Sequence, residues 1–206
     1  MLRDCFASEN KSRRLSVRGG DSTTGPRLGG RPPVGVVPKN KGLSYLITLP
    51  WSEELEVSLF VDADADFIFS SAASVPSGPP HYELIRHEPR PRGESGAYDS
   101  ELSEHPILIG DLVDDAGELD FDGVRQPYSD HKIGGRPYFL QGEPELEDAV
   151  AALLADGFGH AIQLGFPGSP GVDVRGTWPF GDGLFHVLVR EVRDGDGLEW
   201  RCFCEM

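Results

Sequence analysis

One phrase occurs twice in this chain, and the order of segments that follows it is repeated as well. Residues 27–34 read RLGGRPPV and residues 132–141 read KIGGRPYFLQ. Each copy precedes a strand-like segment that ends in Pro (SYLITLP, HAIQLGFP), a second apolar segment (LEVSLFV, LFHVLVREV), an acidic turn and another strand-like segment. A repeated succession of this kind is typical of internal duplication. We therefore expect a single domain over 26–206, built from half-repeats of about 26–106 and 107–206.

Alternating apolar residues predict short strands through most of the chain. Residues 43–49 alternate in this way until Pro50, which predicts a half-buried strand. Residues 54–61 give a second strand, and residues 182–192 and 198–204 form a hairpin around a DGDG turn. The 26 Gly and 17 Pro residues also favour many short strands joined by turns.

Only residues 143–159, EPELEDAVAALLADGFG, have convincing helical periodicity. Pro144 suits the first turn of a helix and Gly157 suits its end. The apolar stripe consists of Leu146, Val150, Leu153 and Leu154. The expected fold is therefore α+β: mostly antiparallel β with one main helix, internally duplicated into two related halves.

The charge of the chain is unevenly distributed. Residues 1–31 hold seven basic and three acidic residues, and residues 1–25 lack apolar periodicity, which predicts a disordered basic N-terminal arm over 1–25. Residues 32–206 hold 12 basic and 31 acidic residues, a formal charge of −19. Such a body repels nucleic acid and anionic membranes and attracts basic proteins. The alternative interpretation is that the acidity serves solubility alone.

Several features of the sequence predict a cytoplasmic location. The sequence has no apolar run near the ~18 residues of a membrane span, and its first 20 residues lack the apolar centre of a secretory signal. The three cysteines, Cys5, Cys202 and Cys204, are too few for a disulfide framework. We expect a cytoplasmic protein with reduced thiols.

The sequence contains no complete catalytic motif. It has no G-x-S-x-G phrase, and no pair of its six histidines has the spacing of a zinc protease. His160 and His186 lie in expected strands of the second half and could face each other, with Cys202 or Cys204 as a further zinc ligand. We predict that the protein is not an enzyme and has neither cofactor nor metal. A metal-dependent hydrolase or a small-ligand-binding protein is the alternative.

The repeated phrase itself has two readings. Backbone N–H groups beside an Arg could cradle an anion, but the spacing and the Lys-Ser/Thr of a nucleotide loop are absent. The favoured interpretation is a tight turn with positive φ. The predicted structural turn residues are Gly29, Gly30, Pro32, Gly134, Gly135 and Pro137.

An acidic stretch at residues 111–122 is the candidate partner-binding surface. Its carboxylates would steer a basic partner, while interleaved apolar residues would anchor the interface. The predicted partner-binding residues are Asp111, Asp114, Asp115, Glu118, Asp120, Phe121 and Asp122. The alternative is a solvated loop over an edge strand.

Several phrases together resemble the YwqG-type family of bacterial proteins, a family of unknown function. They are Gly134-Gly135-x-Pro137 with Gln141, a strand with a central Gln163, and Gly181-Asp182-Gly183 leading into Phe185. The resemblance runs from about residue 26 to 204; Thr48 stands where the family tends to have Gln. It implies a duplicated, mostly β domain, and such domains occur among the immunity proteins of bacterial toxin systems. The resulting hypothesis is a cytoplasmic immunity protein, part of a toxin–antitoxin type of system, that inhibits a basic cognate toxin by protein binding and binds neither nucleic acid nor membrane.

Overall fold

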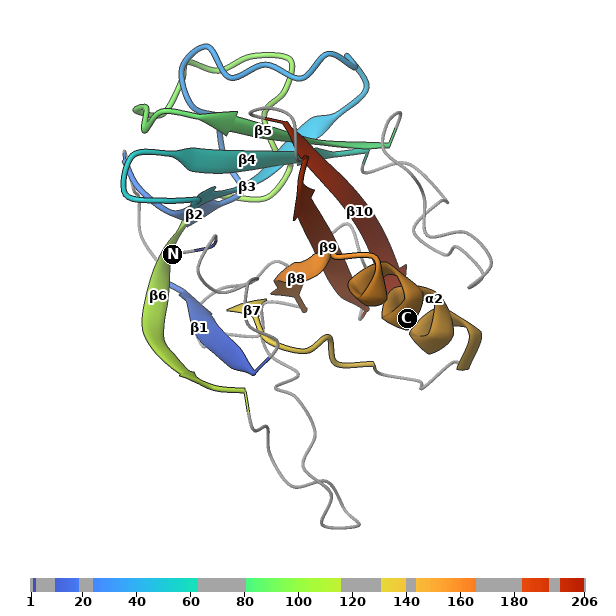
Figure 1. The fold of residues 1–206 in the computed structure, drawn as a ribbon. Coiled ribbons are helices and arrows are strands. Elements are labelled where there is room, and N and C mark those ends of the chain that lie inside the picture. Colours follow the sequence, from blue (N-terminus) through green and yellow to red (C-terminus); the bar gives the residue numbers. More distant parts are fainter. Residues whose placement is uncertain are drawn as a thin grey trace.

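The structure is a computed structural model, and it describes residues 2, 10–18, 24–62, 81–115, 131–139, 144–165, 183–192 and 197–205. Ten strands and one helix have defined bounds within these residues (Figure 1). They are β1 (Lys11–Val17), β2 (Arg27–Leu28), β3 (Ser44–Pro50), β4 (Glu56–Val61), β5 (Tyr82–His87), β6 (His105–Asp114), β7 (Lys132–Gly134), α2 (Pro144–Ala155), β8 (Gly159–Leu164), β9 (Leu184–Glu191) and β10 (Leu198–Glu205).

The strands form one antiparallel sheet with the order β10-β9-β8-β7-β1-β6-β2-β3-β4-β5. The sheet curls into a nearly closed, barrel-like shape, and its two end strands, β5 and β10, approach each other at the top of Figure 1. There the rings of Tyr82 and Trp200 lie 4.9 Å apart. The expectation of a mostly antiparallel β fold with a main helix is confirmed.

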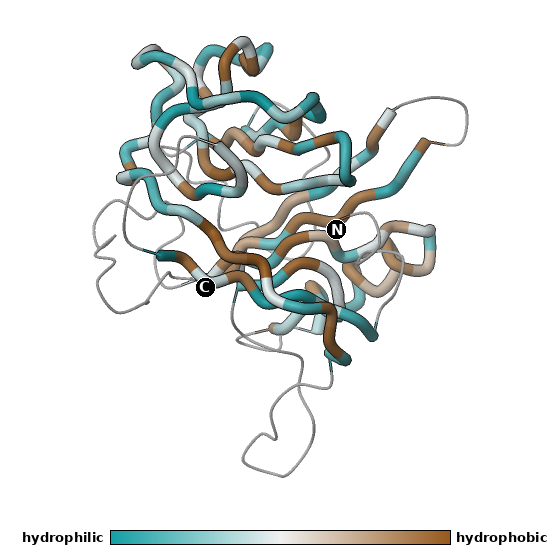
Figure 2. Tube along the Cα trace, turned by 90° about the vertical axis from the view of Figure 1, so that its left-hand side faces the viewer, coloured by the Kyte–Doolittle hydropathy of each residue, from teal (hydrophilic) through white to brown (hydrophobic). Residues whose placement is uncertain are grey.

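The core lies inside the curled sheet, with apolar segments running through the centre of the molecule (Figure 2). Strands β3 and β4 are buried on both faces, so the expectation of a half-buried strand at 43–49 is wrong. The reason is a second layer outside the sheet. Over β3 and β4 it consists of Val36, Leu43 and Tyr98 from the connecting segments. Over β9 and β10 it is the helix, which packs against Leu188 and Phe203.

Helix α2 begins at Pro144 and ends at Ala155, as the sequence predicts. Leu146 and Val150 face the sheet and pack with Phe158, Leu188 and Phe203. Gly157 follows with φ of 88°, a conformation that glycine adopts easily at a helix C-terminus. The helix thus covers the outer face of the second half (Figure 1).

Strand β1 corrects the sequence-based view of residues 1–25 as a disordered arm. Residues 11–17 lie in the middle of the sheet and pair with β6 on one side and β7 on the other. Leu15 and Val17 enter the core. Two apolar residues among five basic and polar ones give too weak a pattern, but hydrogen bonds to two neighbouring strands hold β1 in place.

No helix in the described ranges is both long and apolar enough to cross a membrane.

Candidate functional site

A buried carboxylate fastens the second Gly-Gly-Arg-Pro turn to the sheet. Oδ2 of Asp115 accepts hydrogen bonds from Nζ of Lys132 at 2.9 Å and from the backbone N of Arg136 at 2.7 Å. Its Oδ1 accepts one from Oγ of Ser12 at 3.1 Å. Lys132 also donates to the carbonyl oxygen of Arg136 at 2.6 Å. Since both side chains of the ion pair are fully buried, Asp115 joins the ends of β1, β6 and β7.

This burial excludes Asp115 from a partner-facing surface, so that part of the predicted surface is wrong. A buried ammonium requires a buried counter-charge, and Asp115 supplies it for Lys132. The backbone N–H of Arg136 is also used by this carboxylate. The turn is therefore closed by the protein's own anion, which leaves that donor unavailable to an external one.

The glycines of both copies of the phrase adopt positive φ. The angles are 69° and 74° at Gly29 and Gly30, and 73° at both Gly134 and Gly135. A Cβ at Gly135 would lie 2.0 Å from Oδ2 of Asp115, and one at Gly30 would lie 2.6 Å from Cβ of Glu104. Both conformation and space therefore require glycine.

The prolines follow these turns in both copies. Pro32 accepts a hydrogen bond at its carbonyl from the backbone N of Gly93 at 2.8 Å, and Pro137 is buried in the wall of a cavity.

A pair of buried histidines lies between α2 and the sheet. Nε2 of His160 and Nδ1 of His186 are 3.2 Å apart, so one donates to the other. Phe203 stacks on the His186 ring with centroids 4.5 Å apart. Burial, reinforced by the nearby Lys132, lowers the pKa of His160 to about 3. Burial likewise holds the pKa of His186 well below its ordinary value, so both rings are neutral at physiological pH.

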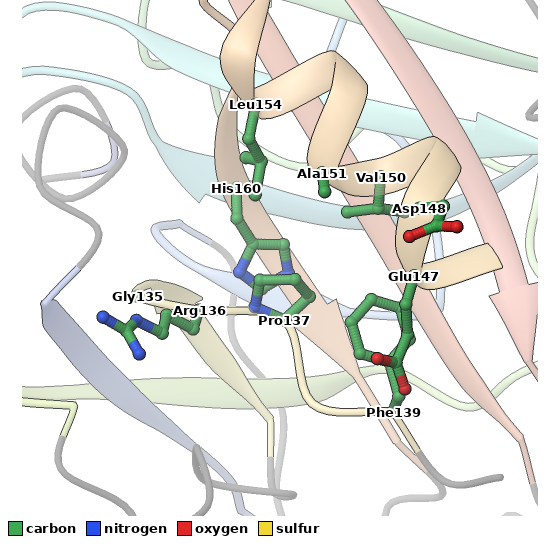
Figure 3. Close-up of a pocket in the computed structure, with 10 residues that line it drawn as sticks. All are labelled: Gly135, Arg136, Pro137, Phe139, Glu147, Asp148, Val150, Ala151, Leu154 and His160. Carbon is green, nitrogen blue, oxygen red and sulfur yellow. The ribbon is translucent and has the colours of Figure 1, made fainter. Parts of the chain in front are cut away.

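A cavity of about 490 Å³ opens between α2 and the second Gly-Gly-Arg-Pro turn (Figure 3). From the sequence, His160 and the Gly-Gly-Arg-Pro turn were considered as possible site residues, but no motif connected them with one face of the helix. The available indication was that KIGGRPYFLQ directly precedes the helix. The lining residues are Gly135, Arg136, Pro137, Phe139, Glu147, Asp148, Val150, Ala151, Leu154 and His160.

The cysteines do not join the histidine pair. In the β9–β10 register Phe203 lies opposite His186, whereas Cys202 lies opposite Val187 and therefore points to the other face of the sheet. Cys202 and Cys204 are buried in the interior core, and burial raises the pKa of the Cys202 thiol. The described residues contain no group of three or more His, Cys, Asp or Glu placed to hold a metal. The arrangement does not fit the zinc site considered from the sequence.

A second buried polar chain, which sequence reasoning missed, runs through the first half. The hydroxyl of Tyr45 donates to Oγ1 of Thr48 at 2.7 Å, and this oxygen lies 2.8 Å from Oγ of Ser58. Oγ of Ser58 in turn lies 2.8 Å from Nε2 of His87. Ser58 is completely buried. A Ser–His contact of this kind resembles a nucleophile and its base, but no substrate can reach the hydroxyl in this conformation. This series of hydrogen bonds satisfies the polar groups of the four side chains inside the sheet.

The predicted partner-binding stretch lies partly within the described residues. Asp111 and Asp114 are exposed at the far end of β6. Nearby, Leu108, Leu112 and Val113 keep 51%, 42% and 40% of their surface exposed. Asp114 forms an ion pair with Lys11 of β1. Glu118, Asp120, Phe121 and Asp122 lie outside the described residues.

Comparisons with protein-family models, with curated proteins and with solved structures found no match to this chain.

Proposed function

We propose that the protein is a cytoplasmic immunity protein that binds and neutralises a basic bacterial toxin, and that it acts by binding rather than by catalysis. The charge of −19 over residues 32–206 and the resemblance to the YwqG-type family support this proposal. The assignment of the partner as a toxin rests on that resemblance.

The observation that carries the proposal is the outer end of β6. Large apolar residues on a sheet are normally covered, yet Leu108, Leu112 and Val113 are exposed there beside Asp111. Exposed apolar residues interleaved with carboxylates are features by which an interface anchors and steers a basic partner. We define this β6 surface as Leu108, Asp111, Leu112, Val113 and Asp114.

The proposal is tested by growth rescue. Cells producing a candidate toxin, encoded in a reading frame adjacent to the gene for this chain, are compared with and without the protein. We expect the chain to restore growth and the double variant Leu112→Ser/Val113→Ser to lose rescue, with binding weakened about tenfold or more because anchor side chains dominate interface energy.

The matched control is Val34→Ser/Val37→Ser, which removes two equally exposed valines from the connection between β2 and β3. It should rescue like the unchanged protein. Failure of the unchanged chain to restore growth would refute the toxin-binding role, and full rescue by the β6 variant would refute the proposed surface.

We also propose that the two halves arose by duplication. The strand pairing supports this, because Arg27 and Leu28 of β2 face Thr48 and Ile47 of β3, and Lys132 and Ile133 of β7 face Gln163 and Ile162 of β8. The next pairing of each half contains an irregularity at the same place, between Tyr45 and Ile47 and between His160 and Ile162.

The first strands are exchanged between the proposed halves. Strand β1 pairs with β7 of the second half, and β6 pairs with β2 of the first. At the centre, β1 and β6 pair with each other, with Ser16 opposite Leu108. On either side of it, Leu15 is paired with Ile109 and Val17 with Ile107. A twofold rotation about the Ser16–Leu108 pair therefore exchanges these two pairs. This register favours a duplicated ancestor whose halves are interlocked.

A further inference from the structure

The cavity beside α2 has walls of three kinds. Phe139, Val150, Ala151 and Leu154 provide an apolar surface, and Glu147 and Asp148 place two carboxylates on the helix. Arg136 is at the opposite side (Figure 3). The volume of about 490 Å³ falls within the range of small-molecule sites, roughly 300–1,000 Å³.

The two ends of the cavity differ in the charge they offer. The guanidinium of Arg136 extends away from the helix (Figure 3) and donates to Oδ1 of Asn10 at 3.4 Å. The carboxylates of Glu147 and Asp148 belong to exposed residues on the helix. The helical end of the cavity is therefore acidic.

His160 adds a buried polar side chain to the wall of the cavity. It is 2% exposed and lines the cavity, and hydrogen bonding to the backbone of Gly134 and Gly135 partly offsets the effect of burial on its pKa. Because the ring is neutral, it does not repel a cation.

We propose that this cavity binds an alkyl guanidinium or alkyl ammonium group. The apolar wall of Phe139, Ala151 and Leu154 takes the methylene chain, and Glu147 and Asp148 take the cationic head. Such a group comes either from an Arg or Lys side chain of a protein or from a free amine, and the same chemistry recognises both. This site does not depend on the proposed toxin, because the free groups can be tested alone.

The test measures binding to the full chain by isothermal titration and by chemical shifts of isotope-labelled protein. The probes are Nα-acetyl-arginine amide, its neutral isostere Nα-acetyl-citrulline amide, Nα-acetyl-glutamate amide and the free amine putrescine. We expect the arginine probe to bind at least about tenfold more tightly than the citrulline probe, since the carboxylates contact only a charged head. Tighter binding of the arginine probe than of putrescine assigns the source as a protein side chain, and the reverse order assigns a free amine.

Two variant pairs locate the binding. Glu147→Gln/Asp148→Asn should weaken the arginine probe about tenfold or more, whereas Glu145→Gln, on the same helix but outside the cavity, should not. Ala151→Leu should block the cavity, whereas Ala152→Leu should leave binding unchanged. All five positions are exposed, and melting temperatures verify folding.

Three results would overturn the proposal. They are equal binding of the arginine and citrulline probes, preferred binding of the glutamate probe, and equal weakening by Glu145→Gln and by the double variant. Loss of toxin rescue without any of these results would count against the proposed function and not against this site.

Discussion

At the scale of single residues, we expect two buried histidines, His160 and His186, to make the protein less stable in acid. His160 and His186 are completely buried and hydrogen-bonded to each other, and burial lowers the pKa of both rings. The unfolded chain takes up protons on these rings near pH 6.5, while the folded chain does not. The folded state therefore binds fewer protons, and acid favours unfolding.

The free energy of unfolding should fall as the pH decreases from about 6.5 toward 3, the pKa of folded His160. The expected slope is at most about 1.4 kcal/mol per pH unit for each histidine. Urea denaturation between pH 7.5 and 5.5 measures it before most carboxylates titrate. The variant His160→Leu/His186→Phe should have a flatter profile, and an unchanged slope would contradict the assignment to these rings.

Lys132 is predicted to be the most sensitive charged residue. Lys132→Met leaves the carboxylate of Asp115 buried without a cation, which costs about 3–5 kcal/mol of unfolding free energy. The double variant Lys132→Met/Asp115→Asn should recover part of this loss, because the amide oxygen still accepts from the Arg136 backbone. A loss below about 1 kcal/mol in the single variant would show that the pair is dispensable.

At the scale of elements, helix α2 and strand β1 differ in how well their own sequences predict them. Helix α2 was predictable because its proline, apolar stripe and terminal glycine all agree. Strand β1 was not, since its partners come from β6 and β7, far along the chain. The same applies to the candidate cavity: His160 was recognised, but its combination with Glu147 and Arg136 depends on how α2 docks.

Three glycine variants separate the cost of a positive φ from the cost of a steric clash in the Gly-Gly turn. Gly25 has φ of 85° and open space around a Cβ, so Gly25→Ala should cost only about 1 kcal/mol for the backbone conformation. Gly96→Ala, with open space and no positive φ, should be nearly neutral. Gly135→Ala adds the clash with Asp115 and should cost at least about 3 kcal/mol in urea denaturation. Equal costs at Gly135 and Gly25 would mean that the carboxylate moves aside easily.

Strand β1 is tested by two adjacent substitutions. Leu15→Asp buries a carboxylate in the core and should abolish folding, whereas Ser16→Asp, at an exposed position, should change stability by less than about 1 kcal/mol. Circular dichroism and thermal unfolding distinguish the outcomes. Tolerance of Leu15→Asp would restore the interpretation of this segment as a dispensable arm.

At the scale of the whole molecule, the sheet order makes the halves depend on each other. Within the described residues, both sheet neighbours of β1 belong to the second half. The repeat in the sequence suggested two halves, but the position of β1 between β6 and β7 could not be predicted, because the local pattern of a strand does not specify its partner.

Cutting the chain in the exposed segment between Gly96 and Ala97 should therefore yield two fragments that are unfolded alone. Co-expressed, they should associate and regain the native sheet, because each supplies the partners that the other lacks. Size-exclusion chromatography and circular dichroism of the separate and mixed fragments provide the measurement. A folded 1–96 fragment would show that the halves are autonomous.

The contact between Tyr82 and Trp200 allows the separation of the two sheet ends to be followed by fluorescence. These rings belong to β5 and β10, the two ends of the sheet, and their centroids lie 4.9 Å apart. At that separation, light absorbed by the tyrosine is passed efficiently to the indole. In a variant that retains Trp200 as its single tryptophan, loss of this transfer would report separation of the two sheet ends while the rest of the molecule is still folded.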